Sequence, residues 1–136
     1  MQAGRIKLRF SRSSRLQRAA EFKLVRAFGK TWTGTHLIMA VLYREADLPS
    51  KIGIVTTKRL GRAVVRNRIR RRIREIFRLN QHQLRRGHWV VMIARASSAC
   101  ASYQELERDW LRLAERASIL RPKPHGPNPA DLTQSV

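Results

Sequence analysis

The chain has 136 residues, of which 29 are Lys or Arg and 9 are Asp or Glu, so its formal net charge is +20. This length suits one compact domain and is too short for two of ordinary size. Because 43% of the residues are hydrophobic, the composition excludes a purely disordered basic protein. A folded body with such a clustered charge is typical of nucleic-acid-binding proteins, and a basic surface that serves only solubility or an anionic membrane is the alternative.

Cys100 is the only cysteine, which excludes an intramolecular disulfide and a cysteine-rich metal site. No apolar run approaches the roughly 20 residues of a membrane-spanning helix, and the first residues lack the apolar core of a secretory signal. We therefore expect a soluble, cytoplasmic protein with no membrane contact. The Arg- and Ser-rich residues 5–18 leave a mitochondrial transit peptide as the alternative.

The first quarter of the chain predicts a basic arm followed by a helix. Residues 1–14 carry four Arg or Lys without a helical period, and we expect a flexible basic arm there. Residues 16–28 have helical apolar spacing, with Ser13 or Ser14 as the expected cap and Gly29 as the stop. On this helix Phe22 is either a core aromatic or a platform on which a nucleobase stacks.

Three segments are then typical of β-strands. Residues 30–33 are β-permissive up to Gly34, residues 36–43 form a nearly continuous apolar run, and residues 51–57 are rich in Ile, Val and Thr. The apolar run suits a strand that is covered on both faces. A turn through residues 47–50 predicts that the second and third segments pair as a hairpin.

Residues 58–78 hold ten Lys or Arg and a single acid, Glu75. Beyond the break at Gly61, the apolar side chains recur at helical spacing, at Val65, Ile69, Ile73, Ile76 and Phe77. One face of this helix should pack on the core, while Asn67 and the arginines cover the remainder. A segment this positive repels itself unless a polyanion neutralises it, so the arginine face is the predicted phosphate-binding surface.

The rest of the chain completes one domain. Residues 89–95 predict a buried strand, and the strand–helix–strand order places residues 52–56 and 90–94 parallel in one sheet. Residues 102–118 predict a helix that begins with a capping box of Ser102 and Glu105. The expected architecture is an α+β, two-layer sandwich over residues 15–119, followed by a disordered Pro-rich tail at residues 120–136.

The sequence offers no catalytic set of its own. Among the acids, only Glu105 and Asp109 share a helical face, where solvated charges are expected. The four histidines lack metal-ligand spacing, and no glycine-rich phosphate loop is present. We therefore expect no metal or cofactor bound by the protein, and another molecule to supply the catalytic groups. The density of arginines favours contact with the backbone of a folded RNA over base reading in DNA.

Residues 51–78, KIGIVTTKRLGRAVVRNRIRRRIREIFR, resemble the signature of the bacterial ribonuclease P protein component. Residues 15–22 with Gly29, and residues 89–95 with the closing helix, extend the resemblance to about residues 15–118. The matching positions within the signature are Gly53, Lys58, Gly61, Ala63, Val64, the Arg66-Asn67-Arg68 triplet, Arg71, Arg74, Glu75 and Phe77.

This resemblance implies an αβββαβα order, a mixed sheet and a left-handed crossover through the basic helix, against the usual right-handed rule. It also implies the protein subunit of a ribonucleoprotein endonuclease that removes the 5′ leader of precursor tRNA. The implied partners are a catalytic RNA subunit and precursor tRNA, with magnesium held mainly by the RNA and no obligate protein partner. The alternatives are a ribosomal or other structural RNA-binding protein and a stand-alone nuclease.

The family's contacts are carried over position by position. Arg26 stands where related proteins often have a second aromatic residue, which favours phosphate contact over stacking there, and His88 replaces a common acid. The implied leader cleft consists of Phe22, Arg26, Asn67 and Arg70. The implied RNA-subunit contact consists of Lys58, Arg59, Arg62, Arg66, Asn67, Arg68, Arg71 and Arg74.

Overall fold

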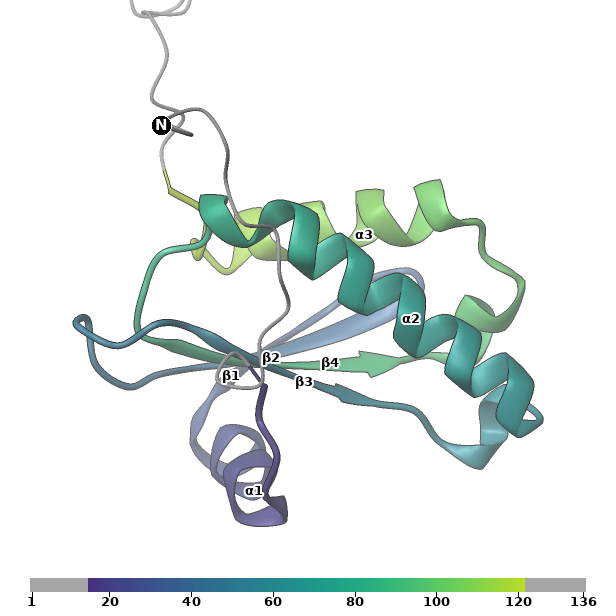
Figure 1. Cartoon of the computed structure of the whole chain (residues 1–136), viewed down its shortest axis with the longest axis horizontal. Coiled ribbons are helices and arrows are strands. Elements are labelled where there is room, and N and C mark those ends of the chain that lie inside the picture. Colours follow the sequence, from purple (N-terminus) through teal and green to yellow (C-terminus); the bar gives the residue numbers. More distant parts are fainter. Residues whose placement is uncertain (1–14, 122–136) are drawn as a thin grey trace, which may run out of the picture.

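The computed structural model describes residues 15–121 (Figure 1). The predicted arm at residues 1–14 and residues 122–136 of the predicted tail lie outside the described residues. The described chain forms three α-helices and a mixed sheet of four strands, with short 3-10 helices between them. This confirms the α+β class and the αβββαβα order.

The helices span Ala19–Phe28 (α1), Ala63–Asn80 (α2) and Tyr103–Arg116 (α3). The expected cap of α1 at Ser13 or Ser14 is wrong, because the helix begins after Arg18, where the Glu21 carboxylate accepts the backbone N–H groups of Gln17 and Arg18. Gly29 ends α1 as predicted, and its N–H donates to the carbonyl of Val25 at 2.8 Å. The capping box of Ser102 and Glu105 at the start of α3 is confirmed.

The strands span Lys30–Thr33 (β1), Leu37–Tyr43 (β2), Lys51–Val55 (β3) and His88–Ala94 (β4), and they lie in the order β1-β2-β4-β3. β3 and β4 are parallel, with Ile52 opposite Val90, as predicted. The predicted hairpin between β2 and β3 is wrong, because β4 lies between them and β2 forms its hairpin with β1. Val90, Val91 and Met92 are all buried, so β4 needs cover on both faces, which a central position provides.

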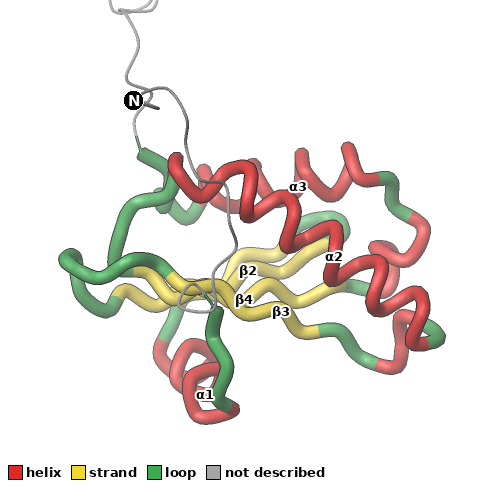
Figure 2. The backbone as a smooth tube through the Cα atoms, viewed as in Figure 1, coloured by secondary structure: helices red, strands yellow, loops and turns green. Residues whose placement is uncertain are grey.

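Helices α2 and α3 cover one face of the sheet, and α1 lies on the other (Figures 1 and 2). On the first face, alternate residues of the strands pack with the apolar sides of both helices. The predicted apolar face of α2 is confirmed, since Ile69, Ile73, Ile76 and Phe77 are buried there and Val65 packs at its margin. Burial of each such side chain stabilises the fold by about 1.5–3 kcal/mol, which holds the arginine-rich helix rigidly on the sheet.

The opposite face carries a second, smaller cluster in which Leu16, Val25, Ala40 and Val91 are buried. Before α1 begins, the chain runs beside β3: Arg15 bridges to Ile52, and the N–H of Leu16 donates to the carbonyl of Ile52 at 3.0 Å. This contact fixes the start of α1 at the β3 edge of the sheet.

Asp109 of α3 is only 3% exposed and ties the helix to the turn between β1 and β2. Its carboxylate oxygens accept the backbone N–H groups of Thr35 at 3.1 Å, His36 at 2.9 Å and Leu37 at 2.8 Å. Gly34 permits this approach, because a Cβ there would lie 2.6 Å from either oxygen. The expectation of a solvated acid at Asp109 is therefore wrong.

Candidate nucleic-acid interface

The basic helix α2 begins with a concentration of positive charge. A 3-10 turn, Lys58–Leu60 (η2), precedes it, with Leu60 buried and Lys58 and Arg59 exposed. Gly61 joins the turn to the helix at a φ of 128°, in a region that side-chain-bearing residues rarely adopt. Arg62 is the N-cap, and the first turn contains no acid. The positive end of the helix dipole and these cations therefore add at one place.

Helical spacing places the residues of α2 that lie outside its apolar core face on two sides of the helix. Asn67, Arg70 and Arg74 recur three and four residues apart along the side toward β3 and α1, and Arg74 lines a pocket there. Val64, Arg68 and Arg72 recur four residues apart along the side toward α3. We call these the cleft side and the α3 side. Within the Arg66-Asn67-Arg68 triplet, Asn67 therefore lies on the cleft side and Arg68 on the α3 side.

Phe22 and Arg74 meet at the cleft-side pocket, although they lie 52 positions apart in the sequence. Phe22 is half-buried, with its ring against Gly53, where a Cβ would lie 2.5 Å from the Cε1 atom of the ring. Part of the ring packs in the smaller core cluster and part lines the pocket, so the two expected roles of Phe22 are compatible. The other lining residues are Arg15, Leu16, Ile52 and Ile54.

Two arginines, Arg15 and Arg74, line this pocket, and Arg70 lies close enough to Arg74 to repel its charge. Burial lowers the pKa of the Arg74 guanidinium, and the positive charges of Arg15 and Arg70 lower this pKa further. None of the residues that line the pocket is acidic. A phosphate placed here would relieve the repulsion among the three guanidinium groups.

Three of the residues implied for the leader cleft, Arg26, Asn67 and Arg70, lie outside the lining of this pocket. Arg26 is exposed one turn after Phe22 on α1, and Asn67 is exposed near the start of α2. Sequence reasoning missed Arg15, because it reaches the site through a non-local bridge to Ile52. Trp89 lies on the same face of the sheet as Phe22, with the Arg44 guanidinium carbon 4.8 Å from its ring centroid.

On the α3 side, two arginines are fixed by backbone carbonyl groups. Arg68 Nη2 donates to the carbonyl of Ala99 at 3.0 Å, and Arg72 Nη1 donates to that of Ala101 at 3.0 Å. Both carbonyls lie in or just after the 3-10 helix Ala96–Cys100 (η4). Arg68, expected at the RNA-subunit contact, therefore also braces α2 against its neighbour, whereas Arg71 is exposed.

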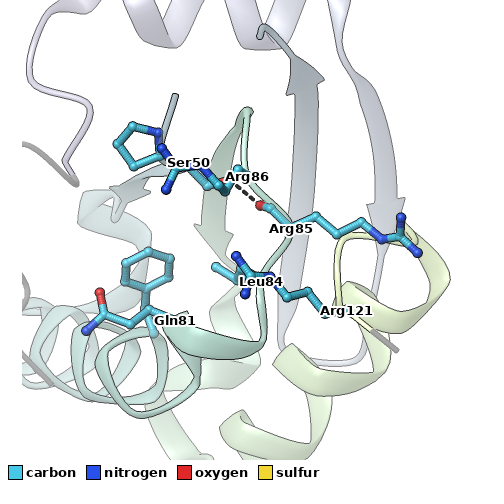
Figure 3. Close-up of a pocket in the computed structure, with 8 residues that line it drawn as sticks. Ser50, Gln81, Leu84, Arg85, Arg86 and Arg121 are labelled. Carbon is cyan, nitrogen blue, oxygen red and sulfur yellow. Dashed lines mark hydrogen bonds between the residues drawn. The ribbon is translucent and has the colours of Figure 1, made fainter. Parts of the chain in front are cut away.

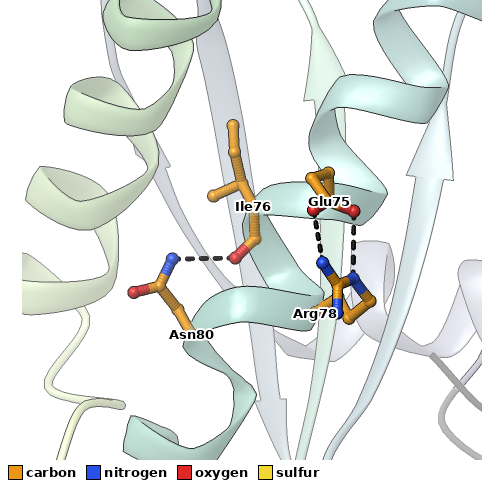
Figure 4. Close-up of polar contacts among 4 residues, drawn as sticks. All are labelled: Glu75, Ile76, Arg78 and Asn80. Carbon is orange, nitrogen blue, oxygen red and sulfur yellow. Dashed lines mark hydrogen bonds and ion pairs between the residues drawn. The ribbon is translucent and has the colours of Figure 1, made fainter. Parts of the chain in front are cut away.

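The single acid of α2 is paired within the helix (Figure 4). Arg78 donates from Nε to Glu75 Oε1 at 3.0 Å and from Nη2 to Oε2, and these hydrogen bonds lower the pKa of the Glu75 carboxyl group. Near the end of the helix, Asn80 Nδ2 donates to the carbonyl of Ile76 at 2.8 Å. Pairing with Arg78 limits the repulsion of Glu75 for a polyanion near the arginines.

A third basic site, which the sequence did not reveal, lies where α2 ends (Figure 3). Arg85, Arg86 and Arg121 line this pocket together with the apolar side chains of Phe77 and Leu84. Arg86 Nη2 donates to the carbonyl of Asp47 at 2.7 Å, and Arg85 Nε donates to that of Leu120 at 3.2 Å. Leu120 and Arg121, expected in the tail, therefore contact the domain.

Four of the acids have structural duties: Glu21 and Glu105 accept hydrogen bonds at helix starts, Glu75 pairs with Arg78, and Asp109 holds the turn after β1. Within residues 15–121, no three or more His, Cys, Asp or Glu side chains gather where they could hold a metal ion. No helix in this part of the chain is long and apolar enough to cross a membrane.

Comparison with known proteins gives one consistent result. A family model described as Ribonuclease P matches residues 10–118. The ribonuclease P protein component of Clostridioides difficile is 33% identical over 111 residues, which cover 81% of this chain and 96% of that protein. The component of Herpetosiphon aurantiacus is 37% identical over 79% of this chain and 87% of its own. The structure of the RNase P protein from Thermotoga maritima matches with a TM-score of 0.69 at 26% identity, over 75% of this chain and 96% of that one.

Proposed function

The chain belongs to the ribonuclease P protein family, and we propose that, as the protein subunit of this ribonucleoprotein, it binds the catalytic RNA subunit and the 5′ leader of precursor tRNA. By holding both, it assists the endonucleolytic removal of the leader. The RNA subunit carries the catalytic groups, and the protein supplies binding and electrostatic stabilisation.

The cleft-side pocket is the observation that carries this proposal. It joins an aromatic ring, Phe22, to a guanidinium, Arg74, whose charge is crowded by Arg15 and Arg70. A flexible single strand is bound by this combination, since bases stack on rings and arginines hold phosphates. Arg70, Asn67 and the exposed Arg26 extend the basic path on either side of the pocket.

The start and outer face of α2 serve the RNA subunit. Neutralised phosphates release counterions, so each arginine contact adds affinity that falls as salt rises. Fixing α2 on the sheet presents these charges in one arrangement, which reduces the entropy lost on binding. In this proposal the contact consists of Lys58, Arg59, Arg62, Arg66, Arg68 and Arg71, together with Asn67 and Arg74, which the RNA subunit shares with the cleft side.

Magnesium belongs to the RNA subunit in this account. Among the described residues, Glu21, Glu75, Glu105 and Asp109 each accept hydrogen bonds from a helix start, an arginine or a turn and do not gather with one another, so the proposal assigns the metal to the RNA. The arginines of the protein reduce repulsion between converging phosphates, so they should lower the magnesium concentration that the assembled ribonucleoprotein needs.

Precursor tRNA cleavage at low magnesium tests the proposal. The purified protein is added to precursor tRNA with and without a bacterial ribonuclease P RNA subunit, and the length of the released leader is measured. We expect no cleavage by the protein alone and strong stimulation of the RNA subunit. Cleavage without the RNA subunit, or no stimulation with it, would contradict the proposal.

A further inference from the structure

The α3 side of α2 carries a second pocket that differs in chemistry from the cleft side. Its lining residues are Val64, Arg68, Arg71, Arg72, Glu75 and Tyr103. The pocket therefore combines cations with an acid, an aromatic ring and an aliphatic side chain. A site for phosphate alone needs neither the carboxylate nor the apolar contacts.

Val64 is the most unusual of these residues, because its apolar side chain is 74% exposed at the start of a helix whose exposed surface is otherwise mainly arginine. Its neighbour one turn on, Arg68, is braced on the carbonyl of Ala99, and Arg72 is braced on that of Ala101. The arginine walls are therefore fixed before any ligand binds, and Val64 provides an apolar contact beside them.

Two polar atoms of this pocket are buried without a hydrogen-bond partner among the described residues: Arg68 Nε and the hydroxyl of Tyr103. A buried polar group without a partner costs about 1–3 kcal/mol. A ligand that brings both acceptors and donors would recover part of that cost after a small side-chain adjustment. Glu75, although paired with Arg78, adds an acceptor to the same wall.

We propose that this pocket accepts two unstacked nucleobases of the RNA bound along α2, one over Val64 beside Arg68 and the other against Tyr103 beside Glu75, since eleven residues of helix separate the two ends by about 16 Å. A nucleobase has the apolar face, the donors and the acceptors that this lining matches, whereas a phosphate would meet the carboxylate of Glu75. The inference rests on the proposed function, since it deepens the contact with RNA. The bases belong to the RNA subunit or to precursor tRNA, and the experiment separates these sources.

Affinity measured across a range of salt concentrations distinguishes a base contact from a phosphate contact. We compare full-length wild-type protein with the Val64→Ser and Tyr103→Phe variants, each titrated with the RNA subunit and, separately, as the reconstituted ribonucleoprotein with precursor tRNA. Serine and valine have similar helix propensities, and Tyr103→Phe removes only an unpaired hydroxyl, so folding should be retained. Thermal unfolding of each variant verifies this.

Val64→Ser removes an apolar contact and Tyr103→Phe removes a hydrogen-bond donor to the base, so each should weaken binding to one of the two RNAs about three- to tenfold, with the slope of log affinity against log salt unchanged. A loss confined to the RNA subunit assigns the base to it, and a loss confined to the precursor assigns the base to the substrate. Leu48→Ser is the control, because it removes an exposed apolar side chain from the loop after β2 and should leave both affinities unchanged.

Wild-type affinity of Val64→Ser for both RNAs would overturn the inference. The inference would also be overturned if the slope of log affinity against log salt fell by about one in Val64→Ser or Tyr103→Phe. Such a decrease is the result expected for the loss of a phosphate contact, as in Arg71→Ala. Failure of the wild-type protein to bind the RNA subunit would instead contradict the proposed function itself, so the two failures are distinguishable.

Discussion

The ring of Phe22 lies against Gly53, at a distance that leaves no room for a side chain on the strand. This contact sets the position of α1 on the sheet and the position of the ring in the cleft-side pocket. The geometry of the proposed leader site therefore depends on a glycine that itself carries no functional group.

Gly53→Ala should displace the Phe22 ring, because the new Cβ would lie 2.5 Å from its Cε1 atom. We expect a loss of about 1–3 kcal/mol in the free energy of unfolding, measured in urea, and weaker binding of precursor tRNA. In a Phe22→Ala background the same substitution should cost much less, since the clash is absent. Equal costs in both backgrounds would show that the two residues are not coupled.

Arg70→Ala should weaken binding of precursor tRNA to the reconstituted ribonucleoprotein. Because Arg70 adds to the positive potential at Arg74, its loss should also reduce the slope of log affinity against log salt by about one. Arg108→Ala, which removes an exposed arginine of α3, is the matched control. An unchanged slope in Arg70→Ala would remove this residue from the phosphate path.

Asp109→Asn should destabilise the protein by about 2–3 kcal/mol, measured by urea unfolding. The amide cannot replace a carboxylate that accepts three backbone N–H groups, because its NH₂ group would face a donor. Glu115→Gln, on the exposed part of the same helix, should have little effect. If Asp109→Asn were as stable as wild type, the turn before β2 would not depend on this carboxylate.

Acid should destabilise the fold through its helix-capping carboxylates. Hydrogen bonds from the backbone hold the pKa values of Glu21 and Glu105 below their usual value near 4.5. Stability from these groups is therefore complete above pH 4.5 and is lost as the pH falls through their lowered pKa values. Glu105→Gln should flatten the acid side of a plot of unfolding free energy against pH, and an unchanged plot would contradict this role.

The sequence predicted the parts of the fold that depend on local patterns. The apolar face of α2, the stop at Gly29 and the cap at Ser102 are periodicities or short motifs, and all three are confirmed. The hairpin between β2 and β3 was wrong, because strand pairing is non-local and the turn signal could not reveal that β4 lies between them.

In the candidate site, too, the sequence predicted local features and missed those that depend on contacts between distant residues. Charge and motif identified α2 as the basic helix, but not which side of it each arginine takes. Asp109 looked like a surface acid, since the turn that it binds lies more than 70 positions away in the sequence. Arg15, Val64 and Tyr103 come together with their pocket neighbours only through tertiary contacts, and although Arg15 and Val64 fall in the matching segments, the sequence did not indicate a pocket at either.

Site-specific cross-linking from the two sides of the protein tests the central claim most directly. With Cys100 replaced by Ser, a photoreactive group is attached to Arg26→Cys on α1 or to Arg71→Cys on the outer face of α2, and each protein is assembled with the RNA subunit and precursor tRNA. We expect position 26 to label the 5′ leader and position 71 to label the RNA subunit. Labelling of the same RNA from both positions would contradict the separation of a leader site beside α1 from an RNA-subunit contact on the outer face of α2.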